Sequence, residues 1–231
     1  MKIICFGDSL TRGVTYVKGR VRILKENYPA LLERKLLSSY SEDLVILNKG
    51  VFNDNSHLLI KRLEKDVISH KPDYVLINIG GNDCNFNWPE VVKDPNNSHM
   101  PIVSIHDYLA NVRKIITTLK EFNIKPVIIT LPPLNPVKYY KFLASQNGTS
   151  ISHWICSCGG IEYWHSLYNT HLNSLIKELH LECIDIREGL MKVVDYQELF
   201  SEDGIHLNQQ GYNEMSEIIY TNLEKIIHTN S

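Results

Sequence analysis

Lys2-Ile3-Ile4-Cys5-Phe6-Gly7-Asp8-Ser9-Leu10 is an apolar run of strand length that ends in a glycine-assisted turn carrying a serine. A run of this kind predicts a buried strand. Ser9 would then lie at the carboxyl end of the first strand, and ligands in open α/β sheets bind just outside such ends. We therefore expect the Ser9 hydroxyl to face a cleft.

The rest of the chain alternates apolar runs with segments of helical period. Further strands are expected at residues 44–48, 74–79, 126–131 and 182–186, and helices at residues 29–39, 56–69, 104–122, 161–179 and 210–227. Runs rich in Ile, Val and Leu on both faces are typical of parallel strands that are covered on two sides. The alternation predicts an α/β fold with a doubly wound parallel sheet, in a single domain over residues 1–231.

Two connections are longer than a plain strand–helix unit needs. Residues 11–28 carry several cations, among them Arg20, Arg22 and Lys25, and residues 132–160 are rich in proline and aromatic side chains. Long connections in compact domains are often lids or binding loops. Residues 132–160 are interpreted either as a lid-like insertion or as a surface excursion. Residues 11–28 are interpreted either as a binding loop, whose cations would favour an anionic substrate if they face the cleft, or as a solvated charged loop.

Composition excludes several classes of protein. A formal net charge of -2 argues against a nucleic-acid partner, which would require a basic surface. No apolar stretch approaches the roughly 18 residues of a membrane span. An odd number of cysteines, five, argues against a disulfide framework and favours a reducing cytoplasm. Removal of a signal peptide would also remove Ser9, so a catalytic Ser9 again fits a cytoplasmic protein.

Polar residues follow several predicted strands at the point where each one ends. Ser9 follows the first strand, a block around Gly50 follows the second, and Asn82 follows the third. In the flavodoxin-like order 2-1-3-4-5 the first strand lies between the second and the third, so these residues would be neighbours. Asp203 and His206 follow the fifth strand after a connecting stretch. We expect all of them at one edge of the sheet.

Ser9, His206 and Asp203 together have the chemistry of an activated nucleophile. A serine hydroxyl is a weak nucleophile at neutral pH and needs a base within hydrogen-bond reach. His206 can take the proton, and Asp203 can accept the other ring N–H and fix the tautomer. Candidate donors for an oxyanion are the backbone N–H groups of Ser9 and Gly50 and the side-chain amide of Asn82.

Four blocks of the sequence resemble those of the GDSL, or SGNH, hydrolase superfamily. They are Gly7-Asp8-Ser9-Leu10, the block around Gly50, Gly80-Gly81-Asn82-Asp83 and Asp203-Gly204-Ile205-His206. The resemblance implies a three-layer α/β/α sandwich and metal-free ester hydrolysis without a cofactor. It assigns catalysis to Ser9, His206 and Asp203. One departure is Asn53, where many members carry a second glycine after the Gly50 equivalent.

The residues beside these blocks bear on the substrate, for which we expect a small-molecule ester. Asp8 and Trp88 are expected to bind it, with Trp88 as an exposed indole among amides that suit a short acyl group or a sugar-like alcohol. A lysophospholipase or thioesterase is an alternative. A non-catalytic binding module on the same fold is another, although the intact Ser9, His206, Asp203 and Asn82 weigh against it.

A metal site is not expected. His153, Cys156, Cys158 and His165 lie close in sequence, but Cys-x-Cys differs from the usual spacing of zinc ligands. The turn after the first strand also lacks the glycine patterns of nucleotide-binding loops. Ordinary packing is the expected role of the two histidines and two cysteines named above.

Overall fold

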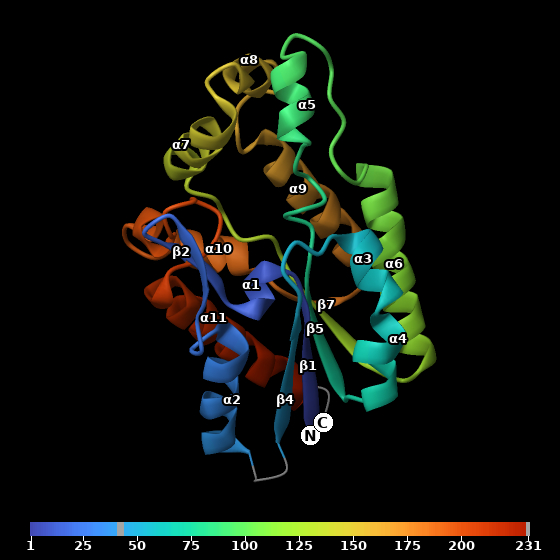
Figure 1. Ribbon diagram of the computed structural model, residues 1–231. Coiled ribbons are helices and arrows are strands. Elements are labelled where there is room, and N and C mark those ends of the chain that lie inside the picture. Colours follow the sequence, from blue (N-terminus) through green and yellow to red (C-terminus); the bar gives the residue numbers. More distant parts are fainter. Residues whose placement is uncertain (41–43, 230–231) are drawn as a thin grey trace.

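The computed structural model describes residues 1–40 and 44–229, and its centre is a parallel sheet (Figure 1). Within the described residues this sheet has five strands in the order β4-β1-β5-β6-β7. They are β1 (Lys2–Gly7), β4 (Val45–Gly50), β5 (Tyr74–Asn78), β6 (Lys125–Ile129) and β7 (Glu182–Ile184). Taken along the chain this is the order 2-1-3-4-5, so the predicted α/β fold and strand order are confirmed.

Helices cover both faces of the sheet because β1 sends alternate side chains to opposite faces. Ile3 and Cys5 enter one core, and Ile4 and Phe6 enter the other. The first core lies under α2 (Tyr28–Ser39), α10 (Ile186–Met191) and α11 (Gln209–Thr229). The second lies under α3 (Ser56–Lys61), α4 (Leu63–Asp66), α6 (Ile105–Glu121) and α9 (Tyr163–Glu178). The result is three layers, as expected.

Four of the five predicted helices are confirmed to within a few residues, as α2, α6, α9 and α11. The fifth, expected over residues 56–69, is wrong as a single helix. It breaks into α3, α4 and a 3₁₀ turn, η1 (Ile68–His70). Arg62 at the first break has non-helical backbone angles, φ −107° and ψ 5°. Its guanidinium instead binds carbonyl groups at the strand ends, which a helical pattern cannot reveal.

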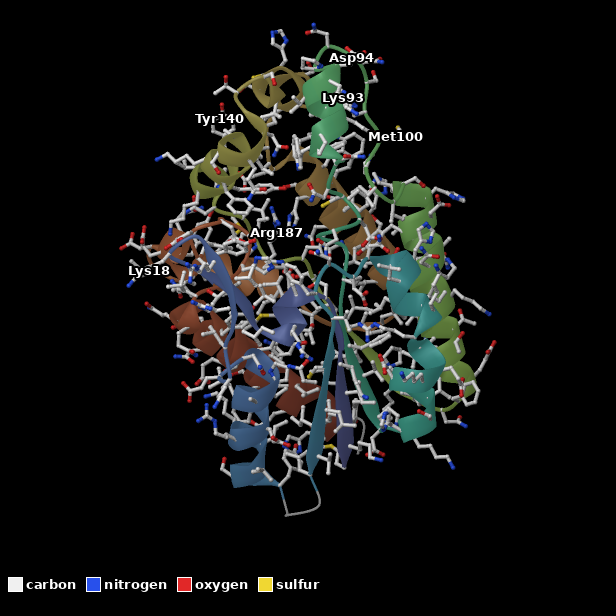
Figure 2. All side chains as sticks on the ribbon, viewed as in Figure 1. Lys18, Lys93, Asp94, Met100, Tyr140 and Arg187 are labelled. Atoms are coloured by element: carbon white, nitrogen blue, oxygen red, sulfur yellow. The ribbon has the colours of Figure 1, made fainter. Side chains whose placement is uncertain are left out.

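The basic connection 11–28 contains α1 (Ser9–Arg12) and a hairpin of β2 (Val14–Val17) and β3 (Arg20–Ile23). Figure 2 shows Lys18 at the hairpin tip on the outer edge of the molecule. Tyr16 pairs with Val21, and Thr15 pairs with Arg22. Arg20 and Arg22 therefore lie on the face opposite Tyr16.

The second long connection folds with residues 86–91 into a small lobe above the carboxyl ends of the strands (Figure 1). Its helices are α5 (Trp88–Lys93), α7 (Pro136–Asn147) and α8 (Ile151–Ser157), and we call this lobe the cap. The cap has an apolar core of its own, which includes Phe86, Leu134, Tyr139 and Ile155. Residues 132–160 thus form most of the cap, and a role of this segment as a lid stays a prediction. In the part of the chain that the structure describes, no helix is long and apolar enough to cross a membrane.

Candidate active site

Ser9, His206 and Asp203 meet at the carboxyl edge of the sheet. His206 Nε2 lies 2.7 Å from Ser9 Oγ, and His206 Nδ1 lies 2.5 Å from Asp203 Oδ2. Ser9 is the first residue of α1, directly after β1, while Asp203 and His206 occupy the loop before α11. All three side chains are buried. The sequence therefore predicted which side chains the fold brings together.

Local hydrogen bonds hold the Asp203 carboxylate in place. Its Oδ1 accepts from Ser201 Oγ at 2.8 Å, from the His206 N–H at 3.1 Å and from the Ile205 N–H at 3.2 Å. Burial favours the neutral acid, but the hydrogen bonds from His206 and Ser201 outweigh it and lower the pKa of Asp203. An ionised Asp203 can orient the imidazole and stabilise its protonated form.

Aromatic rings from different segments border His206. The ring centroid of Tyr16, on the hairpin, lies 6.1 Å from that of His206 in a stacked arrangement. Phe52 lies 6.4 Å from His206, and Phe142 of α7 lies 5.1 Å from Tyr16. Lys18 and Gly19 at the hairpin tip donate backbone N–H groups to the Glu202 carboxylate at 2.7 and 2.8 Å. The hairpin is thus fastened to the loop that carries Asp203 and His206.

The basic face of the hairpin does not take part in this arrangement. Tyr16 contacts His206, and Arg20 and Arg22 lie on the opposite face of the hairpin. These arginines would favour an anionic substrate only if they faced the cleft, and they point away from His206. Sequence analysis missed the contacts of Tyr16 and Phe52 because no motif marks them.

Gly50 does not have a free backbone donor. Its N–H donates to Asn48 Oδ1 at 2.9 Å. A Cβ atom at this position would lie 2.2 Å from the backbone nitrogen of Arg12. The glycine is therefore required by the close packing of β4 against α1. The expectation that the Gly50 N–H faces an oxyanion is corrected by its bond to Asn48.

The loop after Gly50 reaches the site instead. Asn82 Nδ2 donates to the carbonyl oxygen of Asp54 at 2.7 Å, and Phe52 contacts the His206 ring. Asn53, between these two contacts, adopts a left-handed backbone with φ 61°. Within the described residues, the N–H groups of Asn53 and Ser9 have no hydrogen-bond partner. These two N–H groups and the second amide hydrogen of Asn82 are the donors available here.

Arg62 connects the segments that carry these donors. Its guanidinium donates to Gly7 O at 2.8 Å and to Lys49 O at 2.9 Å. It also forms ion pairs with Asp54 at 2.6 Å and Asp66 at 2.9 Å. One largely buried side chain thus fixes the ends of β1 and β4 and the loop that follows β4. Sequence analysis did not single out this residue.

Asp8 lies next to the nucleophile candidate in a structural position. Its Oδ1 accepts the N–H of Leu10 at 3.0 Å and so caps α1, and the residue is only 4% exposed. Burial raises the pKa of Asp8 to about 7, although the bond from Leu10 and the nearby His206 act in the opposite direction. Whether Asp8 contacts substrate stays a prediction.

Trp88 is not the exposed indole that was expected. It is 8% exposed, and its Nε1 donates to Asn85 Oδ1 at 2.9 Å inside the cap. The same oxygen accepts from the Phe86 N–H at 2.9 Å and from Tyr139 Oη at 3.2 Å. The residues that follow Asn82 thus form the base of the cap, because residues 132–160 fold over them. The role of Trp88 in substrate binding stays a prediction.

Two hollows adjoin the catalytic loops. A small cavity of about 40 Å³ is lined by Cys84, Ile205 and, from the cap, Leu134 and Ile155. An open groove of about 600 Å³ begins at Ile205, the residue before His206, and runs between α5 and α7. Asn85 and Tyr139 line both hollows.

The four residues considered as zinc ligands have other surroundings. His165 is buried and its Nδ1 lies 3.2 Å from Arg187 Nη1, while Cys156 is exposed. Figure 2 shows Arg187 below the cap, near the centre of the molecule. Burial and Arg187 lower the pKa of His165 to about 3. Among the described residues, no group of three or more His, Cys, Asp or Glu side chains is placed to hold a metal.

The chain is similar to known proteins over most of its length. Residues 5–213 match the GDSL-like Lipase/Acylhydrolase family. A GDSL esterase/lipase of Oryza sativa subsp. japonica is 27% identical over 76% of this chain, which spans 64% of that relative's length. An acetylxylan esterase of Geobacillus stearothermophilus is 30% identical over 57% of this chain and 59% of that protein.

Solved structures show the same fold. The lipase/acylhydrolase from Enterococcus faecalis superimposes with a TM-score of 0.69, at 20% identity, over 97% of this chain and 95% of that one. At this level of identity the likeness concerns the fold alone. It agrees with the strand order and layers described above.

Proposed function

Because the chain belongs to the GDSL-like lipase/acylhydrolase family, a family of ester hydrolases, we propose that it is a serine esterase acting through an acyl-enzyme intermediate. The observation that carries this proposal is the 2.7 Å contact between His206 Nε2 and Ser9 Oγ. His206 takes the hydroxyl proton as Ser9 attacks the ester carbonyl carbon, and then gives it to the departing alcohol. Water, activated by the same imidazole, releases the acid and restores Ser9.

The developing oxyanion requires donors that are not already engaged. We assign this role to the backbone N–H groups of Ser9 and Asn53 and to the amide of Asn82. Gly50 is left out because its N–H is bonded to Asn48. The mechanism uses only protein groups, so the proposed enzyme is metal-independent and has no cofactor.

The substrate we propose is a small-molecule ester with a short acyl group, including acyl groups carried by a carbohydrate. The small cavity of about 40 Å³ supports a short acyl group. The name of the Geobacillus relative, an acetylxylan esterase, supports the carbohydrate. A lysophospholipid or a thioester with a long acyl chain would need a larger apolar space. A cytoplasmic location stays a prediction.

Covalent labelling by a fluorophosphonate probe tests the proposal. The wild-type protein and a Ser69→Ala control, which alters an exposed serine far from Ser9 in sequence, should be labelled and should hydrolyse p-nitrophenyl acetate. Ser9→Ala should lose both properties while keeping its circular dichroism spectrum. Labelling of a folded Ser9→Ala protein would refute the assignment of the nucleophile. An unlabelled, inactive wild-type protein would favour the non-catalytic binding module.

A further inference from the structure

The open groove between α5 and α7 has no charged lining. None of its described lining residues is Asp, Glu, Lys or Arg, although such residues make up 22% of the chain. Figure 2 shows Lys93 and Asp94 at the outer end of α5, beyond the residues that line the groove. At about 600 Å³ the groove falls within the range of small-molecule sites. A charged ligand would find no ion-pair partner in it.

Four amide side chains line the groove, and all of them keep hydrogen-bonding capacity. They are Asn85, Asn87, Gln146 and Asn147. Asn85 Oδ1 is occupied by Phe86, Trp88 and Tyr139, so its Nδ2 is left as a donor. Asn147 uses its Nδ2 on Leu143 O at 3.0 Å and keeps its oxygen.

Asn87 and Gln146 are exposed, and among the described residues neither side chain has a hydrogen-bond partner. The set thus offers donors and acceptors in similar number.

Apolar surface lies between these amides. A single face of α7 carries Tyr139, Phe142 and Leu143, followed at helical spacing by Gln146 and Asn147. The facing side of the groove includes Phe86 and Trp88. Flat apolar surface with interspersed amides matches a pyranose ring, which has apolar C–H faces and an equatorial rim of hydroxyl groups. A fatty acyl chain would leave the amides without partners, which costs free energy.

One end of the groove borders the loop that carries His206. Ile205 lines it and is followed directly by His206. Phe142 also lines it and contacts Tyr16, whose ring stacks on His206. A group bound at the Ile205 end of the groove would therefore lie close to the loop that carries His206, whose imidazole protonates the departing alcohol. The groove is placed to receive the alcohol part of the ester.

We infer that this groove binds the neutral sugar portion of an acylated carbohydrate, with Asn87 and Gln146 as specificity-determining residues. The inference rests on the proposed esterase function and names the alcohol that it releases. The small cavity that shares Asn85 and Tyr139 with the groove is left for the acyl group.

Paired kinetics on acetylated cellobiose and p-nitrophenyl acetate test the inference. The ratio of kcat/KM for the disaccharide to that for p-nitrophenyl acetate should fall at least about tenfold in the double variant Asn87→Leu/Gln146→Met, which loses two amides. The control Gln210→Met changes an exposed glutamine of α11 outside the groove and should keep the wild-type ratio. An unchanged ratio in the double variant overturns the inference. A rise in activity on p-nitrophenyl octanoate without loss on the disaccharide also overturns it, in favour of an acyl-chain groove.

Binding of unmodified cellobiose separates this inference from the proposed function. Calorimetry on Ser9→Ala should show binding that the double variant on the same background weakens at least about tenfold. This result would support the groove even if the wild-type protein failed to hydrolyse any ester. Absence of cellobiose binding in an enzyme that hydrolyses p-nitrophenyl acetate contradicts the groove and leaves the esterase function intact.

Discussion

Arg62 Nη2 lies 2.8 Å from the carbonyl oxygen of Gly7, the last residue of β1 and two residues before Ser9. The same guanidinium binds Asp54, whose carbonyl oxygen accepts the amide of Asn82. Its carbon also lies 4.5 Å from the centroid of the Phe6 ring. The turn that carries the proposed nucleophile and the loop that carries a proposed oxyanion donor therefore depend on one cation.

Replacement of this cation should disturb catalysis more than binding. We expect Arg62→Met to lower kcat at least about tenfold with little change in KM, because it frees the loop that holds Asn53. It should also destabilise the protein by about 3–5 kcal/mol, since Asp54 is left buried without its partner. Arg62→Lys should recover part of kcat. The control Arg113→Met removes an exposed ion pair to Glu178 and should have little effect on either quantity.

The Asn82 amide should contribute mainly in the transition state. We expect Asn82→Ala to lower kcat about 10²–10³-fold, the loss typical of one oxyanion donor. KM should change little because the interaction strengthens only as charge develops on the oxygen. A large rise in KM at constant kcat would make Asn82 a ground-state binding residue.

Asn53 should act through its backbone and not its side chain. Its φ of 61° is accessible to glycine and asparagine but strained for a β-branched residue. We therefore expect Asn53→Gly to keep kcat within about threefold, and Asn53→Val to lower it at least about tenfold, since strain would displace the N–H. Steady-state kinetics on p-nitrophenyl acetate measure both. Equal loss in the two variants would assign the effect to the Asn53 side chain.

Asp8 should make the folded protein less stable as pH rises. Its pKa is raised from 3.8 to about 7 by burial, so between these values the folded state binds more protons than the unfolded state. The free energy of unfolding should therefore fall with rising pH in this window, by up to about 1.4 kcal/mol per pH unit from this group. Urea unfolding at several pH values measures the slope.

Asp8→Asn retains the oxygen that caps α1 and should flatten that slope. Asp107→Asn is the control, because Asp107 is exposed and the hydrogen bond from Ser104 lowers its pKa. It should leave the slope above about pH 5 as in the wild type. Identical slopes in the wild type and Asp8→Asn would show that Asp8 is ionised throughout this range in the folded state.

The sequence predicted the parts of the site that depend on strand ends and short spacing. Ser9 follows the first apolar run directly, and Asp203 and His206 are close enough in sequence to meet in one loop. Strand ends and spacing could not show which of Gly50 and Asn53 presents its backbone N–H to the oxyanion. A glycine can serve either packing or backbone exposure, and only the position of Arg12 against β4 shows that Gly50 serves packing. An asparagine where the related pattern has glycine was the available signal, because asparagine tolerates a positive φ.

The cap and Arg62 were harder to predict for a different reason. Trp88 is buried by Tyr139 and other residues about fifty positions later, so its exposure depends on how residues 132–160 fold. Arg62 sits in a segment of helical period, and its bonds to Gly7 and Lys49 depend on long-range packing. Patterns along the chain carry no information on either contact.

The small cavity beside Ile205 leads us to expect a preference for short acyl groups. Its volume of about 40 Å³ holds about one or two groups the size of a water molecule or a methyl. Longer chains would have to displace Leu134 and Ile155, and displacing well-packed side chains costs about 1–3 kcal/mol. We expect kcat/KM to be highest for p-nitrophenyl acetate or butyrate and at least about tenfold lower for octanoate and palmitate.

A larger cavity should shift this preference. Ile155→Ala removes apolar volume from the cavity wall and should raise kcat/KM for octanoate relative to acetate by about tenfold, since each methylene that gains burial contributes about 0.8 kcal/mol. Ile176→Ala is the matched control, because Ile176 is 8% exposed against 9% for Ile155. Ile176 belongs to α9 and packs into the core between this helix and the sheet, away from the cavity. The control should destabilise the protein to a similar extent and keep the chain-length profile. A wild-type optimum at octanoate, unmoved by Ile155→Ala, would place the acyl chain outside this cavity.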